Sequence, residues 1–547
     1  MKNRTSTNGQ KSWLSVALLL ALSLLVSACS GGNNGGSASP PASGTAPSSA
    51  PPASKTAAPS GSESAAPSGS ESAAAIDTSD SVTLKLVLLG PKPADTDEVY
   101  AEVNKILKER INAAIELRFL DWNEHAQKYP LMFAANEDFD MAFTSSWSFY
   151  QPTARKGGFL ELTEDMLKKY APTSWEKEDP LGWEQARVDG KLYMVPYDYF
   201  ESGYAMAIIR GDLREKYKLP EVKSQADFAN FLETIAQKEK GIIPFGGPST
   251  NLNGSAIPVM VADLQRLFVH GSVPLVYDMQ SDRPTLSNYL DDPKYVEKLN
   301  MLYEMAQKGA WPKDAIVSKT DWLAAFKEGK TAAHTGNLLT LAGTMDAINL
   351  AHPEWKPEVV DLTPDAKRYR SPLNGGGIGI HATSKHPERA LMALDLLRYD
   401  KELFDLTTYG IKGKHWEPVG DDKYRSLPGS TGYPPDGACP WGWRTSGLYR
   451  QLEGAAGDLL TSTYADWKAN KIVDTKLATF VLDDTNIKNE LAALGNVQKT
   501  YLLPIYHGLV KPEDGIPVAK EKLKQAGIDK VQAEMQKQID AFVAANP

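Results

Sequence analysis

The chain has 547 residues, of which 42% are hydrophobic, so it is long enough for two or more domains with a substantial core. Its formal net charge of −9 argues against nucleic acid as a partner, because phosphate binding needs clustered Lys and Arg. It contains only two cysteines, Cys29 and Cys439, so we expect stability to come from core size and not from disulfides.

The N-terminal segment is typical of a bacterial export signal. Basic residues precede an apolar run at 13–26, which is short for a transmembrane helix. Small residues then lead to Cys29, an ending that resembles the lipobox of bacterial lipoproteins. We predict a signal peptide at 1–28 and a lipid on Cys29 that anchors the protein to the outer face of the bacterial cell membrane. The alternative is an ordinary signal peptide with a chance cysteine.

Residues 29–80 are predicted to form a disordered linker behind that anchor. They consist largely of Gly, Ser, Ala, Pro and Thr, and the eight residues at 57–64 recur at 65–72. Such a segment has too little apolar surface to offset the entropy of ordering it. It therefore serves as a spacer between the membrane and the folded body.

The first folded stretch alternates strands and helices. The pattern predicts strands at 82–90, 114–120 and 139–143, with helices at 95–110 and 125–135 between them. This order is typical of a parallel α/β sheet, whose ligands usually bind beyond the carboxyl ends of the strands. The loops at those ends contain Asp121, Trp122, Ser145, Ser146, Trp147 and Tyr150.

Several segments, in matching order over about three hundred residues, resemble family 1 extracellular solute-binding proteins. They are 136–143 with 158–162, then 189–196, 326–333, and 375–380 with 384–390. The C-terminal part is similar to a larger lipoprotein branch of that family, which carries an uncharacterised C-terminal domain. The segments that carry this second likeness are 409–417, 480–491 and 525–529.

The resemblance implies an α/β fold of the periplasmic-binding-protein type. It is a two-lobe clamp, in which each lobe has a central sheet flanked by helices and hinge crossings join the lobes. We expect lobe 1 at 81–199 plus about 376–412, and lobe 2 at 200–375 plus about 413–547. The crossings are expected near 197–201, 375–380 and 408–415.

The same resemblance implies capture of a sugar or oligosaccharide for an ABC importer, whose transmembrane subunits would be the protein partner. We expect a monomer that is attached to the membrane through the lipid alone. We expect no cofactor, with a bound structural calcium ion as the open alternative. Two alternatives remain, a wall- or polysaccharide-binding lipoprotein without a transport role and a lipid-anchored glycosidase. The chain has no His-Glu-x-x-His, Gly-x-Ser-x-Gly or phosphate-loop motif, which argues against an enzyme.

Sugar sites combine flat aromatic rings with polar side chains, because a sugar has apolar C–H faces and a rim of hydroxyls. The resemblance implies that Trp147, Trp122 and Asp121 in first-lobe loops meet the ligand; packing beside the sheet is the alternative for the rings. It also implies ligand contacts for Glu201 after the first crossing and for Asn337 after the turn at 326–333.

Trp441, Trp443 and Arg444 form the densest aromatic cluster, in a loop rich in Gly and Pro. This setting favours a stacking platform slightly over burial in a core, and Trp416 is a weaker candidate of the same kind. We hypothesise that Trp147 from one lobe and Trp441 with Trp443 from the other sandwich sugar rings from opposite sides.

Overall fold

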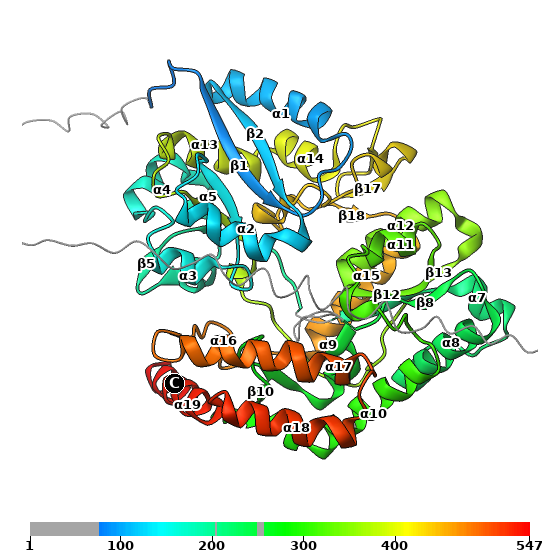
Figure 1. Cartoon of the computed structure of the whole chain (residues 1–547). Helices are drawn as coiled ribbons and strands as arrows, with labels where there is room; N and C mark the ends of the chain where they lie inside the picture. The colour runs from blue at the N-terminus through cyan, green and yellow to red at the C-terminus, as the bar shows by residue number, and fades with distance from the viewer. Residues whose placement is uncertain (1–75, 203–204, 249–255, 547) are drawn as a thin grey trace, which may run out of the picture. The chain divides into compact units, whose positions relative to one another are not determined.

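Two sheets, each accompanied by helices, organise the folded chain into two lobes (Figure 1). The computed structural model describes residues 76–202, 205–248 and 256–546. Ile76–Pro547 form one compact unit. The predicted signal peptide, the lipid site at Cys29 and the linker up to residue 75 lie outside the described residues.

The first lobe is built on a five-stranded sheet in the order β2-β1-β3-β15-β6. β1 (Val82–Leu89) lies parallel to both β2 (Ala113–Leu120) and β3 (Met141–Thr144). β15 (Gly377–Ile380) runs antiparallel to β3 and to β6 (Val195–Pro196). The three parallel strands therefore end at the same edge of the sheet, as the pattern of the sequence predicted.

Helices pack around this sheet. In α1 (Thr96–Ile111), Val99, Val103 and Leu107 are buried at helical spacing, and α1 packs against β2 and α14 (Lys401–Tyr409). The other helices of this part are α2 (Trp122–Ala134), α3 (Tyr150–Arg155), α4 (Glu164–Tyr170), α5 (Pro172–Lys177), α6 (Pro180–Gln185) and α13 (Pro387–Tyr399). Two short strands, β4 (Arg187–Val188) and β5 (Lys191–Leu192), form a hairpin beside them.

The start of the described chain is attached to this lobe. The side-chain amide of Asn112 donates to the carbonyls of Thr78 and Ser79, at 3.1 and 2.9 Å. Arg389 donates to the carbonyls of Asp77 and Asp80. Residues 77–80, which the sequence assigned to the linker, are thus held by the folded body.

The second lobe has a four-stranded sheet in the order β13-β7-β12-β8. β7 (Ala205–Arg210) is antiparallel to β12 (Thr331–Asn337) and β13 (Pro357–Val360), and β8 (Ile243–Phe245) is parallel to β12. Its helices are α7 (Gly211–Lys216), α8 (Gln225–Lys238), α9 (Ala256–Val261), α10 (Pro293–Gln307), α11 (Trp322–Lys327) and α12 (Leu338–Ala351). A second, three-stranded sheet contains β9 (Arg266–Phe268), β10 (Leu275–Asp278) and β11 (Ser287–Asn288).

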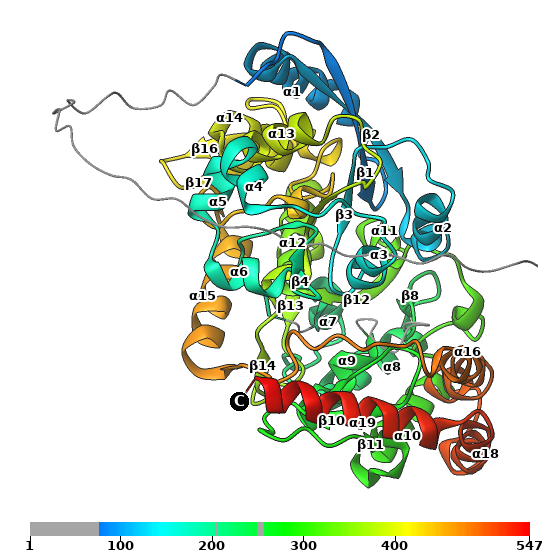
Figure 2. The ribbon, with the colours of Figure 1, turned by 90° about the vertical axis from the view of Figure 1, so that its left-hand side faces the viewer.

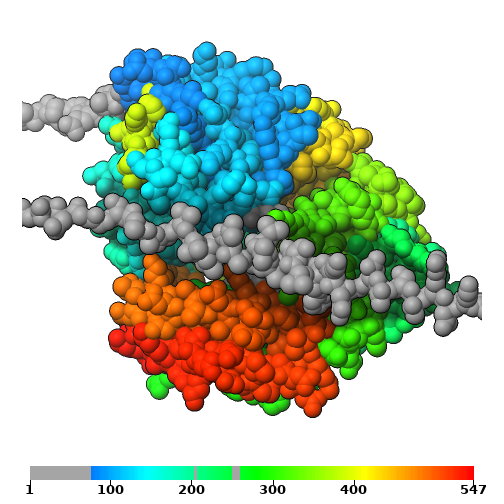
Figure 3. Space-filling view, in the orientation of Figure 1, coloured from blue at the N-terminus to red at the C-terminus, as the bar shows by residue number. Residues whose placement is uncertain are grey.

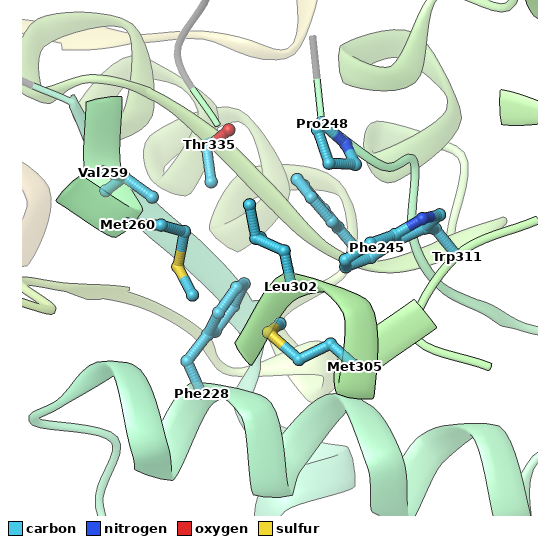
Figure 4. A pocket seen from close by; sticks show the side chains of 9 residues that line it. All are labelled: Phe228, Phe245, Pro248, Val259, Met260, Leu302, Met305, Trp311 and Thr335. Atoms are coloured by element: carbon cyan, nitrogen blue, oxygen red, sulfur yellow. The ribbon is translucent and has the colours of Figure 1, made fainter. Parts of the chain in front are cut away.

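Apolar side chains fill the space between α8, α10 and this four-stranded sheet almost completely. Phe228, Phe245, Leu302 and Trp311 surround a void of only about 10 Å³ (Figure 4). A void of that size holds at most one water molecule, so it is a packing gap and not a ligand site.

The C-terminal helices complete the core of the second lobe. Leu494, Leu502, Val531 and Ile539 are buried in the same hydrophobic cluster as Phe231. The helices are α16 (Lys488–Val497), α17 (Leu503–Tyr506), α18 (Pro512–Gln525) and α19 (Ile528–Ala545). In space-filling view they form one surface with the second lobe (Figure 3).

Three stretches of chain, the crossings, join the lobes, from β6 to β7, from β14 (Arg368–Tyr369) to β15, and from Trp443 to α15 (Ala455–Asp466), and short bridges tie them together. Asp198 pairs with Thr445, and Ser202 pairs with Arg370. The third crossing therefore differs from the predicted one at 408–415, where His415 is buried and hydrogen-bonded to Asp95 of the first lobe.

A small three-stranded sheet lies next to the third crossing, formed by β16 (Trp416–Val419), β17 (Lys423–Ser426) and β18 (Gln451–Leu452). After it, α15 (Ala455–Asp466) packs on α12, and β19 (Ile472–Val473) pairs with β14 (Arg368–Tyr369). In Figure 2, α15 and β14 lie between the first lobe at the top and α19 at the bottom.

Candidate functional site

Three tryptophan side chains meet at the carboxyl edge of the first-lobe sheet. Trp122 begins α2 directly after β2, Trp147 lies between β3 and α3, and Trp441 lies in a 3-10 turn at 440–442. The ring centroids are 6.3 Å apart for Trp122 and Trp147, 5.9 Å for Trp122 and Trp441, and 6.3 Å for Trp147 and Trp441. The ring planes differ by 26°, 2° and 24° in the same order. These near-parallel rings, which we call the tryptophan cluster, form one apolar surface from three separate segments of the chain.

Hydrogen bonds to the backbone orient two of these rings. The indole N–H of Trp147 donates to the carbonyl of Gly375 at 2.7 Å, and that of Trp441 donates to the carbonyl of Asp436 at 3.2 Å. Trp122 and Trp147 nevertheless stay 53% and 56% exposed. Large aromatic side chains that lie together and stay open to solvent are typical of a binding site.

A cleft of about 600 Å³ lies beside Trp147, and both lobes and two of the crossings line it. That volume is in the range of about 300–1,000 Å³ that small-molecule sites occupy. The second lobe contributes β9, β10 and the chain that leads into the C-terminal helices. The lining side chains with polar or aromatic groups are Trp147, Glu201, Ser202, Gln265, Arg266, Phe268, Tyr277, Asn337, Lys367, Tyr369, Arg370, Ser371, Tyr464 and Thr475.

Three basic side chains line this cleft on the side of the second lobe and the second crossing. Arg266 pairs with Asp278 and Arg370 pairs with Asp474, each at 2.9 Å, and Lys367 lies with them in the lining. Both ion pairs are open to solvent, where such pairs contribute only about 0–1 kcal/mol. The two arginines can therefore exchange these partners for ligand oxygens at little cost.

Glu201 of the first crossing is held by a buried arginine behind the cleft. Arg444 donates to Glu201 at 3.2 Å and to Asp436 at 2.9 Å, and its side chain is only 5% exposed. Burial disfavours the charge of Arg444, but Asp436, Tyr449 and Glu201 outweigh that effect and raise its pKa. Glu201 lines the cleft and Arg444 does not. Arg444 therefore holds the carboxylate of Glu201 in position from the side that faces away from the cleft.

The loop that carries Trp147 rests on a buried histidine. Ser148 Oγ lies 3.1 Å from His125 Nε2, and both side chains are buried. Burial lowers the pKa of His125 to about 4. The imidazole is therefore neutral near pH 7 and can accept the hydrogen bond of the serine hydroxyl.

Comparison with known families agrees with this geometry. Residues 103–399, more than half of the chain, match the family described as bacterial extracellular solute-binding protein. The chain belongs to this family. Residues 476–544 also match a domain of unknown function, DUF3502, which covers most of the C-terminal helices. Both parts of the resemblance inferred from the sequence are therefore confirmed.

A curated relative of this solute-binding protein comes from Streptococcus pneumoniae. It is described as a carbohydrate ABC transporter substrate-binding protein and is 26% identical over 491 residues. The match covers 86% of this chain and 92% of the relative.

Solved structures share the two-lobe fold. The N-glycan transport solute-binding protein NgtS from Streptococcus pneumoniae, in complex with Man1GlcNAc, matches with a TM-score of 0.71 at 23% identity. That match covers 85% of this chain and 100% of the other. The alginate-binding protein AlgQ2 without calcium ion matches with a TM-score of 0.61 at 15% identity, over 85% of this chain and 99% of the other. At these identities the likeness concerns the fold, and the predicted fold class is confirmed.

Four further residues singled out from the sequence lie at or near the cleft of the solute-binding protein. Glu201 and Asn337 line it, and the amide oxygen of Asn337 also caps α12 by accepting from the N–H of Thr340 at 2.8 Å. Ser146 lies next to Trp147 and donates its backbone N–H to the carbonyl of Asn374. Asp121 stands directly before Trp122, and its carbonyl accepts from the N–H groups in the first turn of α2.

Two predicted stacking residues are instead core residues. Trp443 is fully buried in the first-lobe core and donates its indole N–H to Thr407 Oγ1 at 3.0 Å. Trp416 is 3% exposed and donates to the carbonyl of Gly410. Neither ring has a free face for a ligand, so the expectation for both was wrong.

The predicted sandwich of rings from opposite lobes also differs from the structure. Trp441 stacks beside Trp122 and Trp147 on the same side of the cleft. The loop at 433–443 packs in the first-lobe core, through Tyr433, Cys439 and Trp443, whereas the sequence assigned it to lobe 2.

Most of the second-lobe wall of the cleft was not predicted from the sequence. Phe268, Tyr277 and Tyr464 have no distinctive neighbours in the sequence, and only the fold brings them to the cleft. The run at 367–370 has a pattern that could have been recognised in the sequence. It contains Lys367, Tyr369 and Arg370, which line the cleft, and it leads into the second crossing.

Two properties of the described residues bear on membranes and metals. No helix within 76–202, 205–248 and 256–546 is long and apolar enough to cross a membrane. The same part of the chain contains no group of three or more His, Cys, Asp or Glu side chains arranged to hold a metal ion.

Proposed function

We propose that this solute-binding protein captures a sugar or oligosaccharide outside the cell and delivers it to the transmembrane subunits of an ABC transporter. One observation carries the proposal: a cluster of three near-parallel tryptophan rings, two of them more than half exposed, stands at the edge of a large cleft that also contains polar and charged side chains.

The chemistry of a sugar suits these walls. Its C–H faces can stack on the rings of Trp122, Trp147 and Trp441, and each such aromatic contact contributes about 0.5–1.5 kcal/mol beyond area burial. Its hydroxyls can exchange hydrogen bonds with Glu201 and Asn337 of the cleft lining. Asp121 and Ser146 stand next to the stacking rings and complete the proposed rim.

The relatives favour the same ligand class. The curated pneumococcal relative is a carbohydrate ABC transporter substrate-binding protein. NgtS has been solved with Man1GlcNAc and with Man5GlcNAc. The shared family and the aromatic cleft together support a carbohydrate ligand for this chain.

Binding would close the two lobes about the crossings. The hydrogen bond from Trp147 to Gly375 joins the tryptophan cluster to the second crossing, so a sugar stacked on this ring acts directly on the hinge. A ligand that touches both lobes stabilises the closed state over the open one by its extra contacts. The closed monomer would then dock on the transporter.

Lipid attachment at Cys29 is the proposed anchor. Replacing Cys29 by Ala should release the protein into the medium or leave it unprocessed, which cell fractionation measures. A Cys29→Ala protein that stays with the membrane and partitions into detergent like the wild type would contradict the anchor, without affecting the proposed ligand.

The ligand is tested by calorimetric titration with a panel of neutral and acidic oligosaccharides. Trp147→Ala should weaken binding about tenfold or more, because it removes a stacking contact and apolar area. Trp175→Ala is the matched control, since this tryptophan lies on the first lobe against Trp183, away from the cleft lining. It should bind like the wild type.

Two results would contradict the proposal. One is that no oligosaccharide binds the folded wild-type protein. The other is that chromatography of the incubated ligand shows shorter sugars, since a binding protein releases its ligand intact.

A further inference from the structure

A second cavity shares one ring with the cleft. Its volume is about 410 Å³, and Tyr464 lines both cavities. We call it the hinge pocket. Its lining residues with polar or aromatic groups are Tyr199, Tyr424, Asp436, Ser446, Tyr449, Arg450, Gln451, Thr461, Tyr464 and Lys468.

Segments from distant parts of the chain build the hinge pocket. The helices α12 and α15, which pack against each other, form one wall. Tyr199 comes from the first crossing and Tyr449 from the third, and their rings lie 4.9 Å apart. The pocket is therefore part of the hinge region and separate from the tryptophan cluster.

Three tyrosine hydroxyls in this pocket are available to a ligand. Tyr199, Tyr424 and Tyr464 line it, and among the described residues no protein group is hydrogen-bonded to their hydroxyls. Burial raises the pKa of Tyr424 well above its ordinary value, so this hydroxyl stays protonated and can donate. Rings with free hydroxyls suit a ligand that has both C–H faces and oxygen acceptors.

Small residues keep the pocket open. A side chain built on Gly343, in the middle of α12, would meet no atom within 4 Å of its Cβ. Ala342 and Ala465 line the pocket beside it. Glycine in the interior of a helix makes that helix less stable than alanine would, and no close packing contact requires a glycine at position 343.

Two of the three charged side chains that line the pocket are paired within the protein. Asp436 accepts hydrogen bonds from Arg444 and Tyr449. Arg450 donates twice to Asp405, at 2.9 Å each. The one remaining charge is the ammonium of Lys468, which lies 4.3 Å from the ring centroid of Phe200 and has no ion pair among the described residues. A ligand here thus finds hydroxyl, amide, aromatic and ammonium groups, which suit a molecule rich in hydroxyls.

We propose that the hinge pocket is a second binding site, for a single neutral hexose unit, distinct from the oligosaccharide cleft. Its volume fits a small molecule. The free hydroxyls together with Gln451 and Thr461 offer hydrogen-bond partners for the sugar hydroxyls.

The experiment is a calorimetric titration of the whole protein with glucose, galactose, mannose and N-acetylglucosamine at millimolar concentrations. At least one sugar should bind, and Trp147→Ala should not weaken that binding. Tyr424→Phe removes one hydroxyl without changing the shape of the ring, and should weaken it about tenfold. Gly343→Phe should abolish it by filling the pocket. Leu350→Phe, on the exposed face of the same helix, is the matched control and should bind normally.

Either of two outcomes overturns the proposal: none of the four sugars binds, or the binding that occurs is unchanged in Tyr424→Phe. If Gly343→Phe does not fold, Tyr424→Phe still decides. Binding that disappears in Trp147→Ala would belong to the cleft and would also overturn it. The oligosaccharide titration is independent, so failure of the hinge pocket leaves the proposed transport function standing.

Discussion

Trp441 and Trp443 are two residues apart, yet only Trp441 belongs to the tryptophan cluster. Trp443 is covered on all sides by the first-lobe core, and its N–H is bonded to Thr407. Trp443→Ala should therefore lower the free energy of unfolding by about 3–5 kcal/mol, because it leaves a large cavity. Urea unfolding measures this loss, and Trp147→Ala should lose far less. A stable Trp443→Ala protein with weakened sugar binding would contradict the assignment of Trp443 to the core.

Buried histidines make stability depend on pH. Burial lowers the pKa of His125 and of His507 to about 4, whereas the unfolded value is about 6.5. Below pH 6.5 the unfolded chain binds protons that the folded protein does not. The contribution of each neutral histidine to the free energy of unfolding is thus fully present above about pH 6.5. It is lost as the pH falls toward 4, by up to about 1.4 kcal/mol per pH unit for each histidine.

Unfolding at a series of pH values between 7.5 and 4.5 tests this dependence. His507 is the informative position, because among the described residues neither ring nitrogen has a hydrogen-bond partner. His507→Phe cannot take up a proton, so its stability should fall less steeply with acid than that of the wild type. Equal slopes would show that His507 does not contribute.

At the scale of elements, Arg444 joins the crossings electrostatically. It lies in the third crossing and binds Glu201 of the first as well as Asp436. Arg444→Met would leave these carboxylates without their cation, and should cost about 3–5 kcal/mol of stability. Because Glu201 lines the cleft, sugar affinity should fall too.

Arg425→Met is the matched control for this prediction. Arg425 also contacts two carboxylates, Glu417 and Glu453, but its side chain is 53% exposed. Its loss should cost less than about 1 kcal/mol, because water screens exposed pairs. Similar unfolding curves for the two variants would mean that the buried network does not stabilise the crossings.

The elements of the first lobe follow from local pattern. The spacing of Val99, Val103 and Leu107 predicted the helix now seen as α1, and the strand predicted at 114–120 is β2. The predicted helix at 125–135 begins earlier, at Trp122, so this ring projects from a helix end and not from a loop. The third crossing was misplaced, because the short pairing of Asp198 with Thr445 has no periodic signature.

At the scale of the whole molecule, closure is the central prediction. A ligand held between lobes joined by three crossings should lower the radius of gyration in solution scattering. The Trp147→Ala protein at the same sugar concentration is the control, and should keep the larger radius. A saturated wild-type protein with an unchanged radius would exclude hinge closure while leaving binding intact.

Sequence alone determined what depends on neighbours along the chain. Hydrophobic spacing located the helices and strands of the first lobe, and ordered motifs identified the solute-binding family and its C-terminal domain. The strand order also placed Trp122 and Trp147 at one edge of the first-lobe sheet, because parallel strands end at the same edge.

Only the tertiary structure decided which side chains are exposed and which meet. Trp443 and Trp416 resemble surface aromatics in their Gly-rich surroundings, but distant segments bury them. Trp122, Trp147 and Trp441 come from three separate segments, and their rings stack only because the fold brings these segments together. Burial and contact depend on residues far along the chain, and spacing in the sequence does not encode that information.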